Sequence, residues 1–185
     1  MENTENTLIN RVAESGLITI NLEDFFPKSE LVLFDIKEYL FMELILKEKD
    51  FRESLKLYDW SSLKGKTLLL YCSNDAIIPT WAYMLVTVNA SVFANNIFQG
   101  TETDYYRYQM QKTIESIDFK KYDQQRIVIK GCGEKPVPAS AYVEITKHLQ
   151  PYAQSIMYGE PCSTVPIFKK PRILSNKTNY EESKS

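Results

Sequence analysis

Two stretches of the chain repeat one another along their whole length without a gap. They are PTWAYMLVTVNASVFANNIFQG, residues 79–100, and PASAYVEITKHLQPYAQSIMYG, residues 138–159. The identical pairs are Pro79/Pro138, Ala82/Ala141, Tyr83/Tyr142, Thr87/Thr146, Ala94/Ala153, Ile97/Ile156 and Gly100/Gly159. Self-similarity at a fixed spacing indicates that one supersecondary unit occurs more than once. The match therefore predicts that two parts of the chain fold in the same way.

Each copy has a short apolar run before its helical segment and another after it. The runs are residues 67–71 and 96–99 in the first copy, and residues 127–130 and 155–158 in the second. Branched apolar runs bounded by turn residues are typical of buried strands. A strand, a helix and a second strand at this spacing form a right-handed crossover with parallel strands. Each copy is therefore predicted to contain a βαβ unit.

These units predict an α/β fold. We expect an open, mainly parallel sheet with helices on both faces, built on the duplicated unit and preceded by an N-terminal α/β extension. A chain of 185 residues has the length of one domain. We assign residues 1–168 to a single domain, with copies at about 51–100 and 110–159, and the polar residues 169–185 to a disordered tail. The apolar residues 30–46 are too continuous to indicate either a helix or a strand.

The charge pattern argues against two classes of partner. Lys and Arg number 22 and Asp and Glu number 24, which gives a net charge of −2, without a dense basic run. We therefore expect neither nucleic-acid binding nor binding to an anionic membrane surface. The polar N-terminus does not resemble a signal peptide, and no apolar run reaches the roughly 18 residues that span a bilayer. These features predict a cytoplasmic protein whose cysteines stay reduced.

All three cysteines follow predicted strands. Cys72 and Cys132 occupy matching places in the two copies when one residue of slack is allowed, and Cys162 follows the last strand of the second copy. The carboxyl ends of parallel strands are where α/β proteins place ligands, and thiolates are favoured near the start of a helix. Soft thiolates select zinc, Cu(I) or iron–sulfur clusters. We predict a metal site formed by Cys72, Cys132, Cys162 and Glu160, with zinc or an iron–sulfur cluster as cofactor.

Other interpretations of the same residues remain open. The fourth ligand could be Glu134, Asp75, water or a partner, and the thiols could be inert small hydrophobic groups, which is common for cytosolic cysteines. The sequence contains no CxxC pair, so the spacing of the cysteines does not by itself support a metal site. A cysteine-dependent enzyme acting on a small anionic or acyl substrate would need a base, and the single histidine, His148, lies about two turns from the cysteine loop. A metal-free module that binds a protein partner is the third alternative.

Several long motifs carry a resemblance to a known family. They are LFDIKEYLF, LILKEKDFRE, SNDAIIPTWAYML, VIKGCGEKPVPASAYVE and SIMYGEPCSTVP. From about residue 9 to residue 170, the chain resembles the uncharacterised bacterial domain-of-unknown-function family 2480. The resemblance brings no assigned activity and no established catalytic or binding residue. It implies an accessory role in building or delivering iron–sulfur clusters, together with a protein partner of that assembly.

Overall fold

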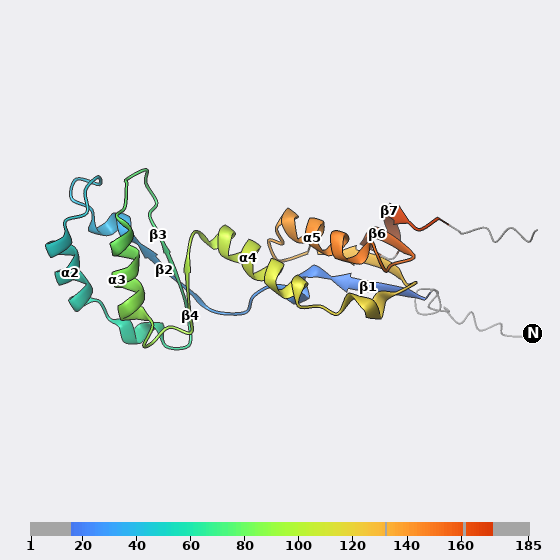
Figure 1. Ribbon diagram of the computed structural model, residues 1–185, viewed down its shortest axis with the longest axis horizontal. Helices are drawn as coiled ribbons and strands as arrows, with labels where there is room; N and C mark the ends of the chain where they lie inside the picture. The colour runs from blue at the N-terminus through green and yellow to red at the C-terminus, as the bar shows by residue number, and fades with distance from the viewer. Residues whose placement is uncertain (1–15, 132, 161, 172–185) are drawn as a thin grey trace, which may run out of the picture. The chain divides into compact units, whose positions relative to one another are not determined.

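The computed structural model describes residues 16–131, 133–160 and 162–171 (Figure 1). These residues form an α/β structure with four α-helices and two open, mostly parallel sheets. The chain divides into two compact units that are not contiguous in sequence. Unit 1 consists of Met1–Asn21, Asp118–Gly131 and Ile145–Ser185, and unit 2 consists of Leu22–Ile117 and Cys132–Glu144.

Unit 2 contains a sheet of three parallel strands in the order β2-β3-β4. The strands are β2 (Leu31–Asp35), β3 (Thr67–Tyr71) and β4 (Asn96–Gln99). The two crossovers contain α2 (Glu48–Leu57) and α3 (Thr80–Ala90), and the short 3-10 helices of the unit are η1 (Leu22–Phe25), η2 (Ile36–Tyr39) and η3 (Trp60–Leu63). The chain then enters α4 (Glu102–Glu115), which starts at a capping box between Thr101 and Asp104. Such a box satisfies free backbone N–H groups at the first turn and fixes the helix start.

Helices α2 and α3 cover the same face of this sheet (Figure 1). The buried core contains Phe34 of β2 and Leu68 and Leu70 of β3, together with Leu55 of α2 and Val86 of α3. The expectation of helices on both faces is therefore wrong for these two helices. The reason is the strand order: β2, β3 and β4 follow one another in a single direction, so two right-handed crossovers place their helices on one side.

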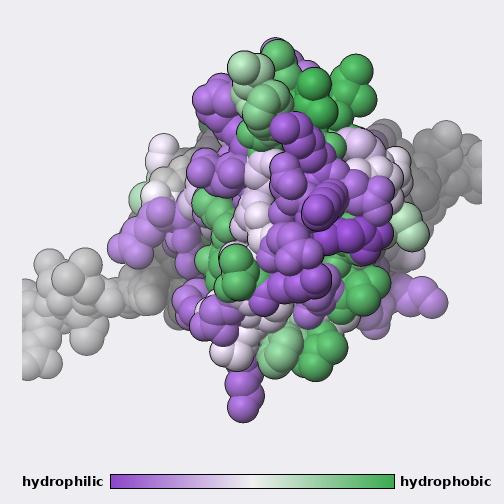
Figure 2. All heavy atoms as spheres, turned by 90° about the vertical axis from the view of Figure 1, so that its left-hand side faces the viewer, coloured by the Kyte–Doolittle hydropathy of each residue, from purple (hydrophilic) through white to green (hydrophobic). Residues whose placement is uncertain are grey.

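The loop between η2 and α2 carries exposed apolar side chains. Phe41, Met42, Leu44 and Ile45 are all exposed. The Phe41 N–H donates to the Ile45 carbonyl across the loop, and Met42 and Glu43 both have positive φ angles. Figure 2 shows hydrophobic side chains gathered along the upper edge of this unit, the edge at which Figure 1 places this loop, next to a largely hydrophilic face.

Unit 1 contains a sheet of four strands in the order β1-β5-β6-β7. The strands are β1 (Leu17–Asn21), β5 (Arg126–Lys130), β6 (Ser155–Glu160) and β7 (Ser163–Lys169), and η4 (Phe119–Tyr122) precedes β5. The pairs β1–β5 and β5–β6 are parallel, whereas β7 returns antiparallel to β6. Helix α5 (Ala139–Leu149) connects β5 to β6, and its residues from Ile145 on belong to unit 1. Ala141, Ile145 and Leu149 are buried along one side of the helix. This spacing of four residues is that of an amphipathic helix.

The predicted strands are confirmed, but they do not form the single sheet that we expected. Residues 67–71, 96–99, 127–130 and 155–158 all lie in strands. The N-terminal strand β1 pairs with β5, whereas β2 pairs with β3. The two predicted βαβ segments therefore lie in two separate sheets, each with its own preceding strand. Lys169, which we placed at the start of a tail, is the last residue of β7. Residues 172–185 lie outside the described part of the chain.

Candidate functional site

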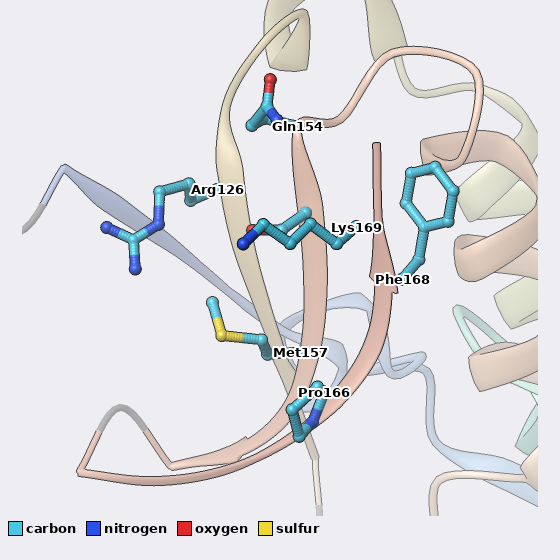
Figure 3. A pocket seen from close by; sticks show the side chains of 7 residues that line it. Arg126, Gln154, Met157, Pro166, Phe168 and Lys169 are labelled. Atoms are coloured by element: carbon cyan, nitrogen blue, oxygen red, sulfur yellow. The ribbon is translucent and has the colours of Figure 1, made fainter. Parts of the chain in front are cut away.

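A pocket of about 590 Å³ lies against the sheet of unit 1. Its lining consists of Arg126, Gln154, Ser155, Met157, Pro166, Phe168 and Lys169 (Figure 3). These residues belong to β5, β6 and β7 or, in the case of Gln154, directly precede β6. In Figure 3 the side chains of Arg126, Met157 and Lys169 extend to the same side of the sheet, whereas Phe168 extends the other way.

The strand register explains how these side chains come together. Ser155 of β6 pairs with Arg126 of β5 on one side and with Lys169 of β7 on the other. Paired residues on neighbouring strands point to the same face. Arg126, Ser155 and Lys169 therefore form one polar row across three strands.

A second row on the same face is apolar. Met157 stands two residues after Ser155, and residues two apart in a strand share a face. Met157 pairs with Pro166 of β7, and a register shift separates this pair from the preceding pair, Ile156 and Phe168. Proline is tolerated here because β7 is an edge strand, on which one side of the backbone needs no partner. The pocket is thus cationic at one end and apolar at the other.

The described part of the lining combines cationic, hydrogen-bonding and apolar side chains. Arg126 and Lys169 carry cationic side chains, Gln154 and Ser155 supply hydrogen-bonding groups, and Met157 and Pro166 supply apolar surface. Among the lining residues that the structure describes there is no Asp, Glu, His or Cys, the types that most often serve as general acids, bases or nucleophiles.

Two residues of the predicted metal site lie in unit 1, at and just after the carboxyl end of β6. Glu160 is the last residue of β6, and its carboxylate accepts from the Lys130 ammonium at 3.3 Å. Cys162 follows in the turn to β7 and is exposed. Lys130 and Glu160 close the carboxyl end of the β5–β6 pair with an exposed ion pair, a type of contact that contributes little to stability.

Cys72 lies in unit 2, directly after β3. It is half-buried and packs against the core of that unit. Its thiol donates to the Asn74 Oδ1 atom at 3.0 Å, and the same oxygen accepts from the Ala76 N–H at 3.1 Å. Burial and then the thiol of Cys72 raise the pKa of the Tyr83 hydroxyl. These contacts are those of a structural cysteine, and metal binding would require the thiol to leave Asn74.

Asp35 connects the loops that follow β2 and β3. Its carboxylate accepts from the N–H groups of Lys37 and Ser73, both at 3.0 Å. Burial by itself would raise the pKa of Asp35, but the hydrogen bonds from Ser73 and Lys37 outweigh it and hold the pKa below its ordinary value. The ionised carboxylate thus fixes this edge of the sheet, which includes the loop that carries Cys72.

The predicted four-ligand site remains a prediction. Cys132 lies outside the described residues, and among those that are described no three His, Cys, Asp or Glu side chains are grouped so that they could hold a metal ion. Glu134 and Asp75, the alternative fourth ligands, are both exposed. His148 stacks on the ring of Phe119, with the ring centroids 5.0 Å apart. This contact gives the histidine a packing role.

The pocket was not predicted, because Lys169 was expected to lie in a tail and no strand was expected after β6. One signal in the sequence indicated otherwise. The segment STVPIFK contains Thr, Val, Ile and Phe, residue types that are enriched in strands, and its proline is compatible with an edge strand. A seventh strand paired with β6 would have placed Lys169 beside Ser155 and Arg126.

Comparison with known proteins identifies the family. Residues 6–170 match the family described as Protein of unknown function (DUF2480). The chain belongs to this family. The match covers all of the described strands and helices, so DUF2480 corresponds to both units. No curated protein and no solved structure matches the chain. None of the described helices combines the length and the hydropathy required to cross a membrane.

Proposed function

We propose that this member of the DUF2480 family is a non-catalytic binding protein that holds a small molecule in the pocket of unit 1. The observation that carries the proposal is the pocket itself, whose volume of about 590 Å³ lies within the range of about 300 to 1,000 Å³ typical of ligand sites. Its lining combines apolar surface with a few polar groups, as such sites usually do. The described lining residues do not supply an acid–base pair, so the proposal is one of binding.

Filling the pocket is expected to abolish binding. In Ser155→Phe, a large side chain replaces a small one between Arg126 and Lys169, on a strand that tolerates aromatic residues. Compounds from a diverse small-molecule set that raise the melting temperature of the natural protein should no longer do so in this variant. Differential scanning fluorimetry measures the shift, and at a hundredfold excess over Kd a ligand contributes about 2.7 kcal/mol of stability.

The matched control is Ser163→Phe, which places the same ring on an exposed position at the start of β7, outside the pocket lining. It should retain the ligand-induced shifts. Undiminished shifts in Ser155→Phe, or no stabilising compound in the whole set, would contradict the proposal.

A second proposal concerns the thiols: the protein binds zinc or an iron–sulfur cluster as an accessory in cluster assembly. Its support is the position of Cys72 directly after β3 and of Cys162 two residues after β6, where strands of parallel pairs end. Thiolates are the ligands that such metals prefer. Cys132 and Glu160 complete the proposed set.

Metal analysis tests this second proposal. Protein purified without oxygen should contain bound zinc or iron, and Cys132→Ser should lose most of it, since each thiolate supplies a direct bond to the metal. Elemental analysis and sulfur-to-metal absorption bands are the measurements. Serine at Cys72 and at Cys162 should act alike, and protein that stays colourless and metal-free after anaerobic cluster reconstitution would refute the assignment.

We also propose that the two βαβ cores arose by internal duplication. In support, both follow the order 3-10 helix, strand, helix, strand, with η3-β3-α3-β4 in one and η4-β5-α5-β6 in the other. Matching backbone hydrogen bonds recur at matching positions. The Ala82 N–H donates to the Pro79 carbonyl and the Ala141 N–H to the Pro138 carbonyl, both at 2.9 Å. The Asn95 N–H donates to the Lys66 carbonyl and the Gln154 N–H to the Gln125 carbonyl, both at 2.8 Å.

A further inference from the structure

We infer that the outer surface of α2 and α3, the side that faces away from the sheet of unit 2, is the contact surface of a symmetric dimer of this chain. The surface combines an exposed apolar ridge on α3 with a pocket beside it. It belongs to unit 2, whereas the pocket proposed to bind a small molecule belongs to unit 1. The inference therefore goes beyond the proposed function and does not depend on it.

Helix α3 carries apolar side chains on its outer side as well as toward the sheet. Ala82 and Val86 are completely buried in the core of unit 2, whereas Met84, Val88 and Val92 are between 63% and 79% exposed. The three exposed residues follow one another at intervals of four, so they form one ridge along the helix and the turn after it. A helix that is apolar on its outer side as well is typical of one that is covered from both sides.

The second repeat shows that this kind of crossover does not require the ridge. In the ungapped match between residues 79–100 and 138–159, Val88 corresponds to Lys147 and Leu85 corresponds to Glu144. Helices α3 and α5 both connect two parallel strands. The crossover therefore also forms with charged residues at these positions, and the apolar ridge of α3 needs an explanation other than the fold of the unit.

A pocket of about 270 Å³ lies between α2 and α3. Its described lining comes from both helices and includes Lys49, Arg52, Lys56, Leu85 and Asn89. Each helix returns from one parallel strand to the next, so the two helices run in the same direction, side by side on one face of the sheet (Figure 1). Leu85 and Asn89 directly follow Met84 and Val88 in the sequence. The pocket therefore runs alongside the ridge.

Polar side chains around the pocket have partners within their own helices. The Arg52 guanidinium and the Lys56 ammonium each donate to a glutamate of α2, at 2.9 and 3.0 Å. The Asn89 amide donates to the Leu85 carbonyl at 2.8 Å. An apolar partner can cover the stems of such side chains without leaving their polar ends unpaired. The pocket therefore suits an apolar ridge.

A second copy of the chain supplies that ridge. Rotation by 180° about an axis that runs parallel to the helices, between the ridge and the pocket, places the ridge of each copy in the pocket of the other. Each helix is about 15 Å long and the pair is about 20 Å wide. Because side chains project from it, two such surfaces together bury on the order of 1,000 Å², the lower end of the range for specific interfaces. We therefore expect a dimer that dissociates at micromolar concentrations.

Sedimentation equilibrium of the full-length protein tests the inference. Between about 1 and 500 µM the protein should show a monomer–dimer equilibrium. Val88→Lys should weaken it about a hundredfold, because the substitution removes an apolar contact, introduces a charge and occurs twice in a symmetric dimer. Val88 is exposed in the single chain and lysine favours helices, so circular dichroism should show an unchanged fold.

The matched control is Val143→Lys in α5. It makes the same substitution at a valine of similar exposure, 67%, on the crossover helix of the other repeat. It should leave the association unchanged.

A mixing experiment tests the symmetry. Rotation about an axis parallel to the helices brings the two Val88 positions to the same height, on neighbouring α3 helices. Val88→Glu should be monomeric like Val88→Lys, and an equimolar mixture of the two variants at low salt should restore part of the association through opposite charges. A mixture that stays monomeric would overturn this arrangement.

Other outcomes would overturn the dimer itself or its assignment to α3. Protein that remains monomeric throughout the concentration range would exclude the second copy. If Val88→Lys then lowers the melting temperature of the monomer, another part of the same chain covers the ridge. A dimer that Val88→Lys leaves intact, or that Val143→Lys weakens equally, would show that the contact surface lies elsewhere.

Discussion

Replacing Leu55 with alanine is expected to lower the free energy of unfolding of unit 2 by about 3 kcal/mol. Leu55 lies on the inner side of α2, retains only 3% of its exposed surface and belongs to the core that α2 and α3 form with the sheet. Alanine would remove most of the buried side chain and leave a cavity, and both effects destabilise the folded state. The backbone carbonyl that accepts from the Trp60 indole at 2.8 Å would remain.

The same helix offers a matched control. Leu57 stands two residues further along α2 and is 87% exposed, so Leu57→Ala should change the stability by less than about 0.5 kcal/mol. Both tryptophans of the chain, Trp60 and Trp81, belong to unit 2. Urea unfolding followed by tryptophan fluorescence therefore reports on this unit. Similar midpoints for the two variants would show that α2 does not pack as described.

Replacing Gly159 with alanine is expected to destabilise unit 1 by about 2 kcal/mol or more. Gly159 has a φ angle of +120°, which residues with a side chain rarely adopt, and a Cβ atom there would meet the Ser163 carbonyl oxygen at 2.6 Å. That oxygen belongs to the backbone of β7, so the contact could be relieved only by moving the strand. Conformational strain and steric overlap therefore add at this position.

Replacing Gly16, in the same unit, separates the conformational strain from the steric overlap. Its φ angle is +62°, but a Cβ atom there would have no neighbour within 4 Å. Gly16→Ala should therefore show only the conformational effect, about 1 kcal/mol. Hydrogen exchange of the β5 and β6 amides measures both variants, because it reports on unit 1 directly. An effect of Gly159→Ala no larger than that of Gly16→Ala would contradict the close approach of β7.

The strands of the two βαβ units could be predicted because their side chains are buried on both faces. Leu68, Leu69 and Leu70 of β3 and Ile127 and Val128 of β5 are almost completely buried, and such strands appear in the sequence as unbroken apolar runs. The pairing of one strand with another produces no comparable pattern in the sequence. Which strands share a sheet depends on contacts between distant parts of the chain, so the separation into two sheets could not be predicted from the repeat.

Residues 30–46 and strand β7 could not be predicted either, because neither has a clear hydrophobic pattern in the sequence. Residues 30–46 contain a strand, a 3-10 helix and a loop with exposed apolar side chains, so their hydrophobicity does not reflect burial and no single period describes them. Strand β7 is an edge strand that contains a proline and begins and ends with polar residues, so no strand was predicted there and its last residue, Lys169, was assigned to the tail. Since β7 supplies three of the pocket residues, the pocket was missed along with the strand.

The interrupted order of unit 1 bears on how the protein folds during synthesis. Leu17 of β1 pairs with Arg126 of β5, and the three strands of unit 2 all lie between them in sequence. The ribosome therefore delivers every strand of unit 2 before the neighbour of β1 exists. Unit 2 can fold early from near neighbours in sequence, whereas β1 must wait as an unpaired strand until its distant partner arrives, and such long-range pairing is slow and exposed to aggregation.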